Sequence, residues 1–162
     1  MLLFFCFTFI LVGCNKGETS EQAFETYIKL WNDKKFADMY DQLSKHAKES
    51  ISKKEFTEKN EKIHKGIGVE NLKVKRKEVI KDKTENKVIL FTVSMDTAGG
   101  KISFSHEAKL VQEKDGDKKS WKINWTPDFI FPGMKKIIKS VCRQSKEKTT
   151  FIYGCSLFFK EL

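Results

Sequence analysis

Apolar residues recur at helical spacing in the first part of the chain. The first set follows the polar sequence Thr-Ser-Glu-Gln and consists of Ala23, Phe24, Tyr27, Ile28 and Trp31. Thr19 can accept a hydrogen bond from the backbone of Gln22 while the Gln22 side chain reaches back, which is the capping box that starts many helices. We therefore predict a helix that begins after Thr19 and ends near Asn32.

Two further helices are predicted downstream. The shorter has one apolar stripe at positions i, i+3, i+4 and i+7, formed by Phe36, Met39, Tyr40 and Leu43. The longer begins at a second capping box, from Ser52 to Glu55, and has a sparse apolar face of Phe56, Ile63 and Ile67. Gly66 or Gly68 is expected to end it, because glycine readily adopts the backbone conformation that terminates helices.

The hydrophobic period changes to two after Gly68, which indicates β-strands. Four β-rich stretches follow, which contain the sequences NLKV, KVILFTVSM, KISFSHEAKLV and SWKINW. Turn-forming residues at 98–100 and 114–117 separate the last three stretches. Antiparallel hairpins are therefore expected.

The last stretch places its largest side chains on one face. Trp121, Ile123 and Trp125 alternate with polar residues, and the amphipathic helices are expected to cover the face that they form. Tyr27 and Trp31 of the first helix should then lie against that sheet. The predicted fold class is α+β, with three N-terminal helices packed on a curved antiparallel sheet of about four or more strands.

The N-terminal residues are apolar and precede a cysteine. A membrane span needs about 20 apolar residues, whereas residues 1–13 match the shorter apolar stretch of a signal peptide, although no basic residue precedes them. Leu-Val-Gly-Cys at 11–14 resembles the bacterial lipobox, in which cleavage leaves a lipidated cysteine at the new N-terminus. We interpret 1–14 as a lipoprotein signal peptide with Cys14 as the lipidation site, and 15–19 as a tether. The alternative is a buried N-terminal strand or helix.

The net charge of +9 is concentrated at the C-terminal end. Residues 135–162 have seven Lys or Arg and two acidic residues, which leaves 24 basic against 20 acidic residues in 15–134. This near balance, without a basic stripe interleaved with aromatic residues, is typical of a solvated surface. We therefore expect no nucleic-acid partner, and the basic excess is more compatible with anionic lipid headgroups or wall polymers.

Cysteine spacing gives no support for a metal centre. Residues 15–141 contain no cysteine, and no His lies between Cys142 and Cys155. A structural zinc site needs more ligands at closer spacing than these two cysteines offer. We expect no metal and no cofactor.

The order of helices followed by a β-meander looks like the cone-shaped NTF2-like fold. The sequences FETYIKLWNDKKFADMYDQLS, VSMDTAGGKISFSHEAKLV and SWKINWTPDFIFPGM are also closely similar to the N-terminal domain of low-affinity class B penicillin-binding proteins. This resemblance covers residues 20–134 and implies a noncatalytic stalk that holds a transpeptidase domain away from the membrane. The intact protein would be a serine-type peptidoglycan DD-transpeptidase linked to β-lactam resistance.

The resemblance also implies a location and partners. Such enzymes are exported and tethered to the outer face of the cell membrane, here through the lipid anchor on Cys14. Peptidoglycan or other cell-wall synthesis proteins are the expected partners.

The family's catalytic motifs do not occur together in this chain. They are Ser-x-x-Lys, Ser-x-Asn and Lys-Thr-Gly in a C-terminal domain. Ser50 to Lys53 and Ser145 to Lys148 match the first motif, but neither of the other two motifs is present, and Ser52 is already a predicted helix cap. We therefore expect no catalytic residue and no enzymatic activity in this chain.

Residues 135–162 depart from the family's pattern, which continues into a linker and a further domain. Two cysteines and the apolar sequence FIYGCSLFF occur here after a long stretch without cysteine. We interpret this atypical tail as the product of a reading-frame shift near Lys136 that truncated a longer gene. The alternative is a short paralogue with a tail of its own.

Two other functions stay open. NTF2-like enzymes carry out proton transfer in a pocket between the sheet and the helices, for which the candidates here are Tyr40, Asp96, His106 and Glu107. His46 and His64 lie among Lys and Glu on helical segments and are expected to be solvated. The second alternative is a stand-alone NTF2-like scaffold or ligand-binding lipoprotein.

Overall fold

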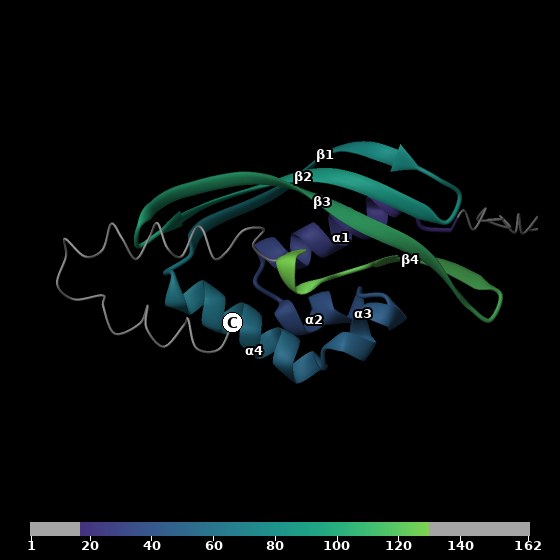
Figure 1. Ribbon diagram of the computed structural model, residues 1–162, viewed down its shortest axis with the longest axis horizontal. Helices are drawn as coiled ribbons and strands as arrows, with labels where there is room; N and C mark the ends of the chain where they lie inside the picture. Colours follow the sequence, from purple (N-terminus) through teal and green to yellow (C-terminus); the bar gives the residue numbers. More distant parts are fainter. Residues whose placement is uncertain (1–16, 130–162) are drawn as a thin grey trace, which may run out of the picture.

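The computed structural model describes residues 17–129. They form, in chain order, α1 (Ser20–Asn32), α2 (Phe36–Asp41), α3 (Lys45–Ser50), α4 (Lys53–Gly66), β1 (Glu70–Asp82), β2 (Asn86–Thr97), β3 (Gly100–Asp115), β4 (Lys118–Ile123) and the 3-10 helix η1 (Pro127–Phe129). The helices lie on one side of the sheet, which curves over them (Figure 1).

The sheet has the strand order β1-β2-β3-β4, and every neighbouring pair is antiparallel. The ladder between β2 and β3 runs without a register shift from Asn86 to Thr97, while the ladder between β1 and β2 has three irregularities. Such irregularities bend and twist a strand locally, which fits the curvature of the sheet at this edge. The predicted α+β class with a curved antiparallel sheet is confirmed.

Both predicted capping boxes are present. Gln22 donates its backbone N–H to Thr19 Oγ1 at 3.2 Å, and Thr19 donates its own N–H to Gln22 Oε1 at 2.9 Å. The same exchange joins Ser52 and Glu55 at the start of α4, at 3.2 and 3.0 Å. Local sequence therefore determines where the two long helices begin.

The described residues form four α-helices, whereas three were predicted. The apolar stripe that begins at Phe36 was expected to continue helically to Leu43, but α2 ends at Asp41 and a separate helix, α3, follows Ser44. Ser44 donates its N–H to the Ile123 carbonyl, and Ile123 donates to the Gln42 carbonyl, both at 2.9 Å. These hydrogen bonds to β4 replace further helical ones, which is a tertiary effect that local periodicity does not show.

The side chain of Asn32 protects the outer edge of β1. Its Nδ2 donates to the Val74 carbonyl at 3.2 Å, and its Oδ1 accepts the Val74 N–H at 2.8 Å. The amide thus satisfies two backbone groups that an edge strand would otherwise present to another chain. It also joins the C-terminal end of α1 to the sheet.

The core lies between the helices and the inner face of the sheet. The sheet contributes Val74, Ile89, Phe91, Val93, Met95, Ala108, Leu110, Trp121 and Ile123, and the helices contribute Phe24, Tyr27, Ile28, Trp31, Phe36, Met39, Phe56 and Ile63. All of these side chains are buried. Burial of apolar area on this scale is the main favourable contribution to folding.

The three large residues of the last stretch are all buried, but they belong to two kinds of structure. Trp121 and Ile123 lie in β4, whereas Trp125 lies beyond the end of that strand. The Trp125 ring meets Phe56 of α4 edge to face, with 5.4 Å between ring centroids. The chain after β4 therefore turns toward the helical layer.

Candidate functional site

The space between sheet and helices, which is the predicted position of a catalytic pocket in the enzyme alternative, is filled by aromatic rings. Phe91 of β2 lies at its centre, with ring centroids 5.5 Å from Phe24, 6.1 Å from Trp31 and 5.4 Å from Phe129. Tyr27 packs against Trp31 at 6.1 Å and Phe129 at 5.9 Å. Tyr27 and Trp31 of α1 thus lie inside this aromatic cluster, and Trp31 reaches the sheet through β2.

The four candidates for proton transfer do not share one site, although His106 and Glu107 line the same open hollow. Asp96 accepts a hydrogen bond from Asn71 at 2.7 Å, and it lies five residues along β2 from Phe91, the cross-strand partner of His106. At about 3.3 Å per strand residue, Asp96 and His106 are separated by roughly 16 Å. Glu107 is exposed, while His106 lies near the rings of Phe91 and Phe129.

Tyr40, the fourth candidate, has a structural role. Its hydroxyl donates to the Ile51 carbonyl at 3.1 Å, and its ring packs against Phe56 at 5.9 Å between centroids. The side chain therefore connects α2 with the segment before α4. None of these contacts joins Tyr40 to His106 or to a carboxylate.

The expectation that His64 is solvated is wrong. Its side chain is in the core, with 6% exposure, and its ring meets Phe36 at 4.8 Å between centroids. Neither ring nitrogen has a hydrogen-bond partner. Burial, with a contribution from the positive charge of Lys34, lowers the pKa of His64 to about 4. The apolar face of α4 is wider than its sequence indicates, because tertiary packing covers a polar position.

The serines that match Ser-x-x-Lys within the described residues serve local structure. Ser50 Oγ donates to the Ala47 carbonyl at 2.7 Å, and Ser52 caps α4 as predicted. Lys53, the lysine of the motif, pairs with Asp41 at 2.8 Å. No contact of this lysine activates a serine, so the match has no catalytic geometry.

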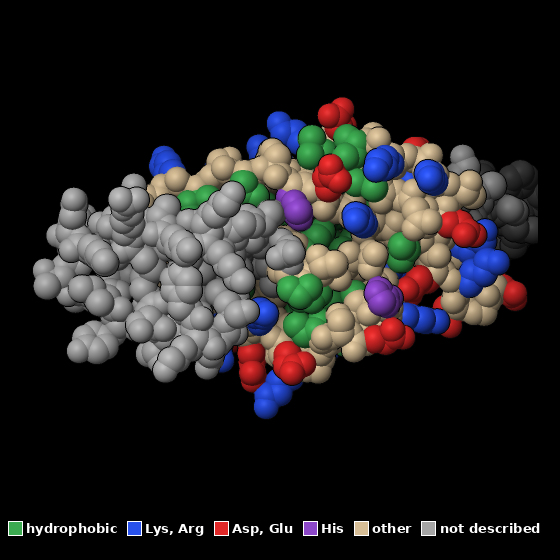
Figure 2. Space-filling model, in the orientation of Figure 1, with side chains coloured by type: hydrophobic (Ala, Val, Ile, Leu, Met, Phe, Trp, Pro, Cys, Tyr) green, Lys and Arg blue, Asp and Glu red, His purple; other side chains and the backbone are tan. Residues whose placement is uncertain are grey.

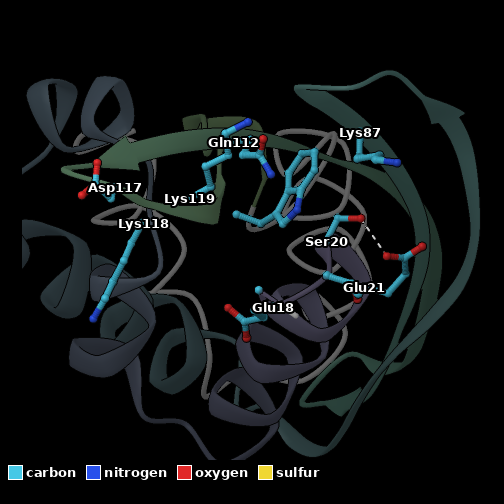
Figure 3. Close-up of a pocket in the computed structure, with 11 residues that line it drawn as sticks. Glu18, Ser20, Glu21, Lys87, Gln112, Asp117, Lys118 and Lys119 are labelled. Atoms are coloured by element: carbon cyan, nitrogen blue, oxygen red, sulfur yellow. Dashed lines mark hydrogen bonds between the residues drawn. The ribbon is translucent and has the colours of Figure 1, made fainter. Parts of the chain in front are cut away.

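An open cleft of about 730 Å³ lies between the start of α1 and the β3–β4 hairpin. Figure 3 shows Glu18 on one side of the cleft, Gln112 and Lys119 opposite, and Ser20 beside Glu21. Sequence reasoning did not identify this cleft. It brings together residues just over 100 positions apart in the chain, such as Glu18 and Lys119, and no local sequence pattern indicates that they lie close together.

The cleft is charged and its groups already interact with one another. Ser20 donates to Glu21 at 2.8 Å, and this hydrogen bond is the main cause that lowers the pKa of Glu21. Lys87 pairs with Asp82, and its ammonium lies 5.7 Å from the ring centroid of Trp121. A carboxylate held in its ionised form is a poor general acid at neutral pH. The cleft is therefore suited to polar contact rather than to proton transfer.

The outer surface shows mixed charge. In Figure 2, Lys and Arg side chains alternate with Asp and Glu over the visible face, and apolar side chains are scattered among them. Among residues 17–129, no group of three His, Cys, Asp or Glu side chains has the arrangement of a metal site. Within the same residues, no helix is long and apolar enough to cross a membrane.

Several predicted features lie outside the described residues. They are the signal peptide at 1–14, the lipidation site Cys14, Ser145, the cysteines Cys142 and Cys155, and the atypical tail 135–162. The first described residue, Gly17, lies at the cleft beside Lys119 of β4. The segment that would carry the tether therefore joins the domain at the end where α1 begins.

Comparisons with known proteins agree with this architecture. The MecA_N family, the NTF2-like N-terminal transpeptidase domain, matches residues 19–137. Penicillin-binding protein 3 of Bacillus subtilis (strain 168) is 45% identical over 135 residues, which cover 81% of this chain and 20% of that protein. The chain thus spans about a fifth of the length of that relative.

A solved structure shows the same general fold. A SEC-C motif containing protein from Psychrobacter arcticus superposes with a TM-score of 0.54 over 68% of this chain and 60% of that chain. The two sequences are 11% identical. At this identity, the likeness extends to the fold alone.

Proposed function

This chain belongs to the family of NTF2-like N-terminal transpeptidase domains, and from that membership we propose that it is the noncatalytic stalk of a penicillin-binding protein. In the intact protein, the stalk would hold a peptidoglycan DD-transpeptidase domain away from the membrane. The intact enzyme would cross-link peptidoglycan by serine acyl transfer and contribute to β-lactam resistance. This activity would belong to a domain that follows the stalk.

One observation carries the proposal. The space between sheet and helices, where NTF2-like enzymes hold their reactive groups, is filled by Phe24, Trp31, Phe91 and Phe129. A stalk must hold the domain that follows it at a fixed distance from the membrane and does not need to bind a reacting group. A tightly packed aromatic core gives it the stiffness for this role. The use of Ser50 and Ser52 in local structure also supports a noncatalytic role.

We further propose that the stalk is tethered through a lipid on Cys14 to the outer face of the cell membrane. The lipobox resemblance at 11–14 supports this proposal. With residue 14 in the membrane interface and Gly17 at the cleft, three residues would span at most roughly 11 Å. The end of the domain that contains the cleft would then lie close to the lipid surface.

A domain exchange tests the stalk function. In Bacillus subtilis penicillin-binding protein 3, the segment matched by this chain is replaced either by residues 19–137 of this chain or by a flexible Gly/Ser linker. Both hybrids should be acylated by fluorescent penicillin, because the acylating domain is unchanged. Only the domain hybrid should restore peptidoglycan cross-linking in cells, because a flexible linker does not fix the height of the enzyme. Equal restoration by the linker would contradict a stalk function.

The alternative of a stand-alone ligand-binding lipoprotein is favoured by the open cleft. Its volume of about 730 Å³ is within the range of small-molecule sites. Most such sites are predominantly apolar, however, whereas this one is lined by several charged side chains, among them Lys87, Glu18 and Glu21. Changing Lys119, an exposed residue of the cleft, to Ala and measuring the binding of soluble cell-wall muropeptides would distinguish the two functions. Tight binding that this variant loses would favour the ligand-binding function.

A further inference from the structure

Lysines from three separate elements converge on Asp41 at the end of α2. Lys48 of α3 and Lys122 of β4 each donate from Nζ to the Asp41 backbone oxygen at 3.3 Å. Lys53, the first residue of α4, donates to both carboxylate oxygens of Asp41 at 2.9 and 2.8 Å. We call Lys48, Lys53 and Lys122 the Asp41 lysine cluster.

Two ammonium groups of the cluster are forced close together. Because the Nζ atoms of Lys48 and Lys122 are each 3.3 Å from the same oxygen, they are at most 6.6 Å apart. The Asp41 carboxylate is already engaged by Lys53. Glu113, the other carboxylate that acts on Lys48, accepts the backbone N–H of Lys45 at 2.8 Å. Three positive and two negative charges leave the site with a net positive charge.

Lys48 is held in place in this crowded environment. Burial, followed by the charge of Lys122, lowers the pKa of Lys48, whereas Asp41 and Glu113 act in the opposite direction. The Lys48 ammonium also lies 5.5 Å from the ring centroid of Tyr40, whose face attracts a cation. A positioned cation that a neighbouring cation destabilises is stabilised when an anion arrives.

We propose that the Asp41 lysine cluster binds a phosphate group, free or in a lipid headgroup, between Lys48 and Lys122. An ammonium has three N–H donors, and each of these two lysines uses one of them on the Asp41 oxygen. A phosphate can accept a charge-assisted hydrogen bond of about 2.8 Å from each lysine through different oxygens. Binding would relieve the repulsion between the two lysines. The site does not depend on the proposed stalk function.

Phosphate titration of the full chain, followed by NMR of the lysine side chains, tests the site. Lys48 and Lys122 should show saturable shifts, and the pKa of Lys48 should rise in the presence of phosphate. The double variant K48Q/K122Q should lose affinity for inorganic phosphate by roughly tenfold or more, because two charge-assisted contacts are removed. Unchanged affinity in this variant would overturn the proposal.

A matched control removes the same charge elsewhere. Lys73 and Lys75 are exposed neighbours on one face of β1, and K73Q/K75Q should keep the affinity of the unchanged chain. An equal loss in both double variants would mean general screening of surface charge and would count against a site. If K48Q/K122Q fails to show cooperative thermal unfolding, Lys122→Gln alone replaces it, since Lys48 then keeps its position over Tyr40.

Vesicles distinguish the two sources of phosphate. The chain is made with Cys14→Ala, so that no lipid anchor contributes, and mixed with vesicles of phosphatidylglycerol or phosphatidylcholine. Preferential binding to phosphatidylglycerol that K48Q/K122Q loses would assign the site to a lipid headgroup. Saturable phosphate shifts without a vesicle preference would assign it to soluble phosphate. Vesicle binding unaffected by K48Q/K122Q, without phosphate shifts at Lys48, would contradict the site.

Discussion

The burial of the His64 imidazole affects how the stability of the domain depends on pH. Both ring nitrogens lack a hydrogen-bond partner, and Phe36 packs against the ring. Nearby, the Lys34 ammonium donates to the Val69 carbonyl at 3.4 Å, and Val69 donates its N–H to the His64 carbonyl at 2.8 Å. A proton on His64 would therefore place a charge in the core beside another cation.

We predict that acid weakens this domain through His64. The folded pKa of about 4 is below the unfolded value of 6.5, so the unfolded state binds the proton more tightly. Stability from this group is complete above pH 6.5 and falls as the pH drops from 6.5 toward 4, with a total loss of about 3 kcal/mol. Urea unfolding at a series of pH values measures the slope of the free energy of unfolding against pH.

His64→Leu should flatten that slope and keep or raise stability at pH 7, because it removes two unsatisfied nitrogens from the core. The control is His46→Gln, since His46 has 85% exposure of its side chain and fills no core position. A slope unchanged by His64→Leu would show that another group is responsible.

The second residue-scale prediction concerns Trp125. Trp125→Ala should destabilise the domain by about 3–5 kcal/mol, because the ring is buried against Phe56 and leaves a large cavity. A single domain has only about 5–15 kcal/mol in total, so this variant should be close to unfolding. Thermal and urea unfolding measure the effect.

Trp125→Phe is the matched comparison. It keeps an aromatic ring at this position and removes the indole N–H, which is buried without a partner. Its cost should be below that of the Ala variant, on the order of 1 kcal/mol. Equal losses in the two variants would mean that ring packing is not the source of stability there.

At the scale of secondary-structure elements, side chains decide where helices begin and where the sheet ends. Thr19 and Ser52 each satisfy backbone N–H groups that the first turn of a helix leaves unpaired. Asn32 does the equivalent for Val74 at the outer edge of β1. The ends of helices and the edge of the sheet in this domain are thus stabilised by side-chain hydrogen bonds to the backbone, as well as by core packing.

We predict that Asn32→Ala destabilises the domain by about 1–3 kcal/mol, because it leaves both polar groups of the Val74 backbone without their partner. It should also favour self-association, since an uncovered strand edge pairs with other chains. Urea unfolding and analytical ultracentrifugation measure the two effects. Asn32→Asp keeps the acceptor for the Val74 N–H and should lose less; a larger loss than in the Ala variant would contradict this role.

At the scale of the whole molecule, the position of the N-terminal end is the main consequence of the fold. Gly17 lies at the cleft beside Lys119, so the residues just before α1 and the β3–β4 hairpin share one end of the domain. If Cys14 carries a lipid, this end faces the membrane.

We predict that Cys14→Ala releases the protein from the membrane or leaves it unprocessed. The sulfur of Cys14 is the atom that would bond to the lipid. Residues 1–13 are too few to form a comfortable membrane span by themselves. Membrane fractionation and gel mobility measure the outcome, with Cys6→Ala as the matched control. Identical fractionation and mobility of both variants and the unchanged chain would rule out lipidation at Cys14.

Much of the fold could be predicted from local patterns. The capping boxes at Thr19 and Ser52 and the alternation of Trp121 and Ile123 rest on interactions within a few residues, so sequence spacing is sufficient to identify them. The α+β class follows because amphipathic helices and a one-sided sheet must bury their apolar faces against each other.

Only the tertiary structure decided the rest. The separation of α2 from α3, the burial of His64 and the convergence of three lysines on Asp41 all depend on residues far apart in the chain. Such contacts form because packing brings distant elements together, and it can override a local preference when it satisfies more hydrogen bonds or buries more area. The sequence by itself therefore determined the starts of the two long helices, the β-rich stretches and the fold class, while packing decided the break between α2 and α3, the cleft, the buried imidazole and the lysine cluster.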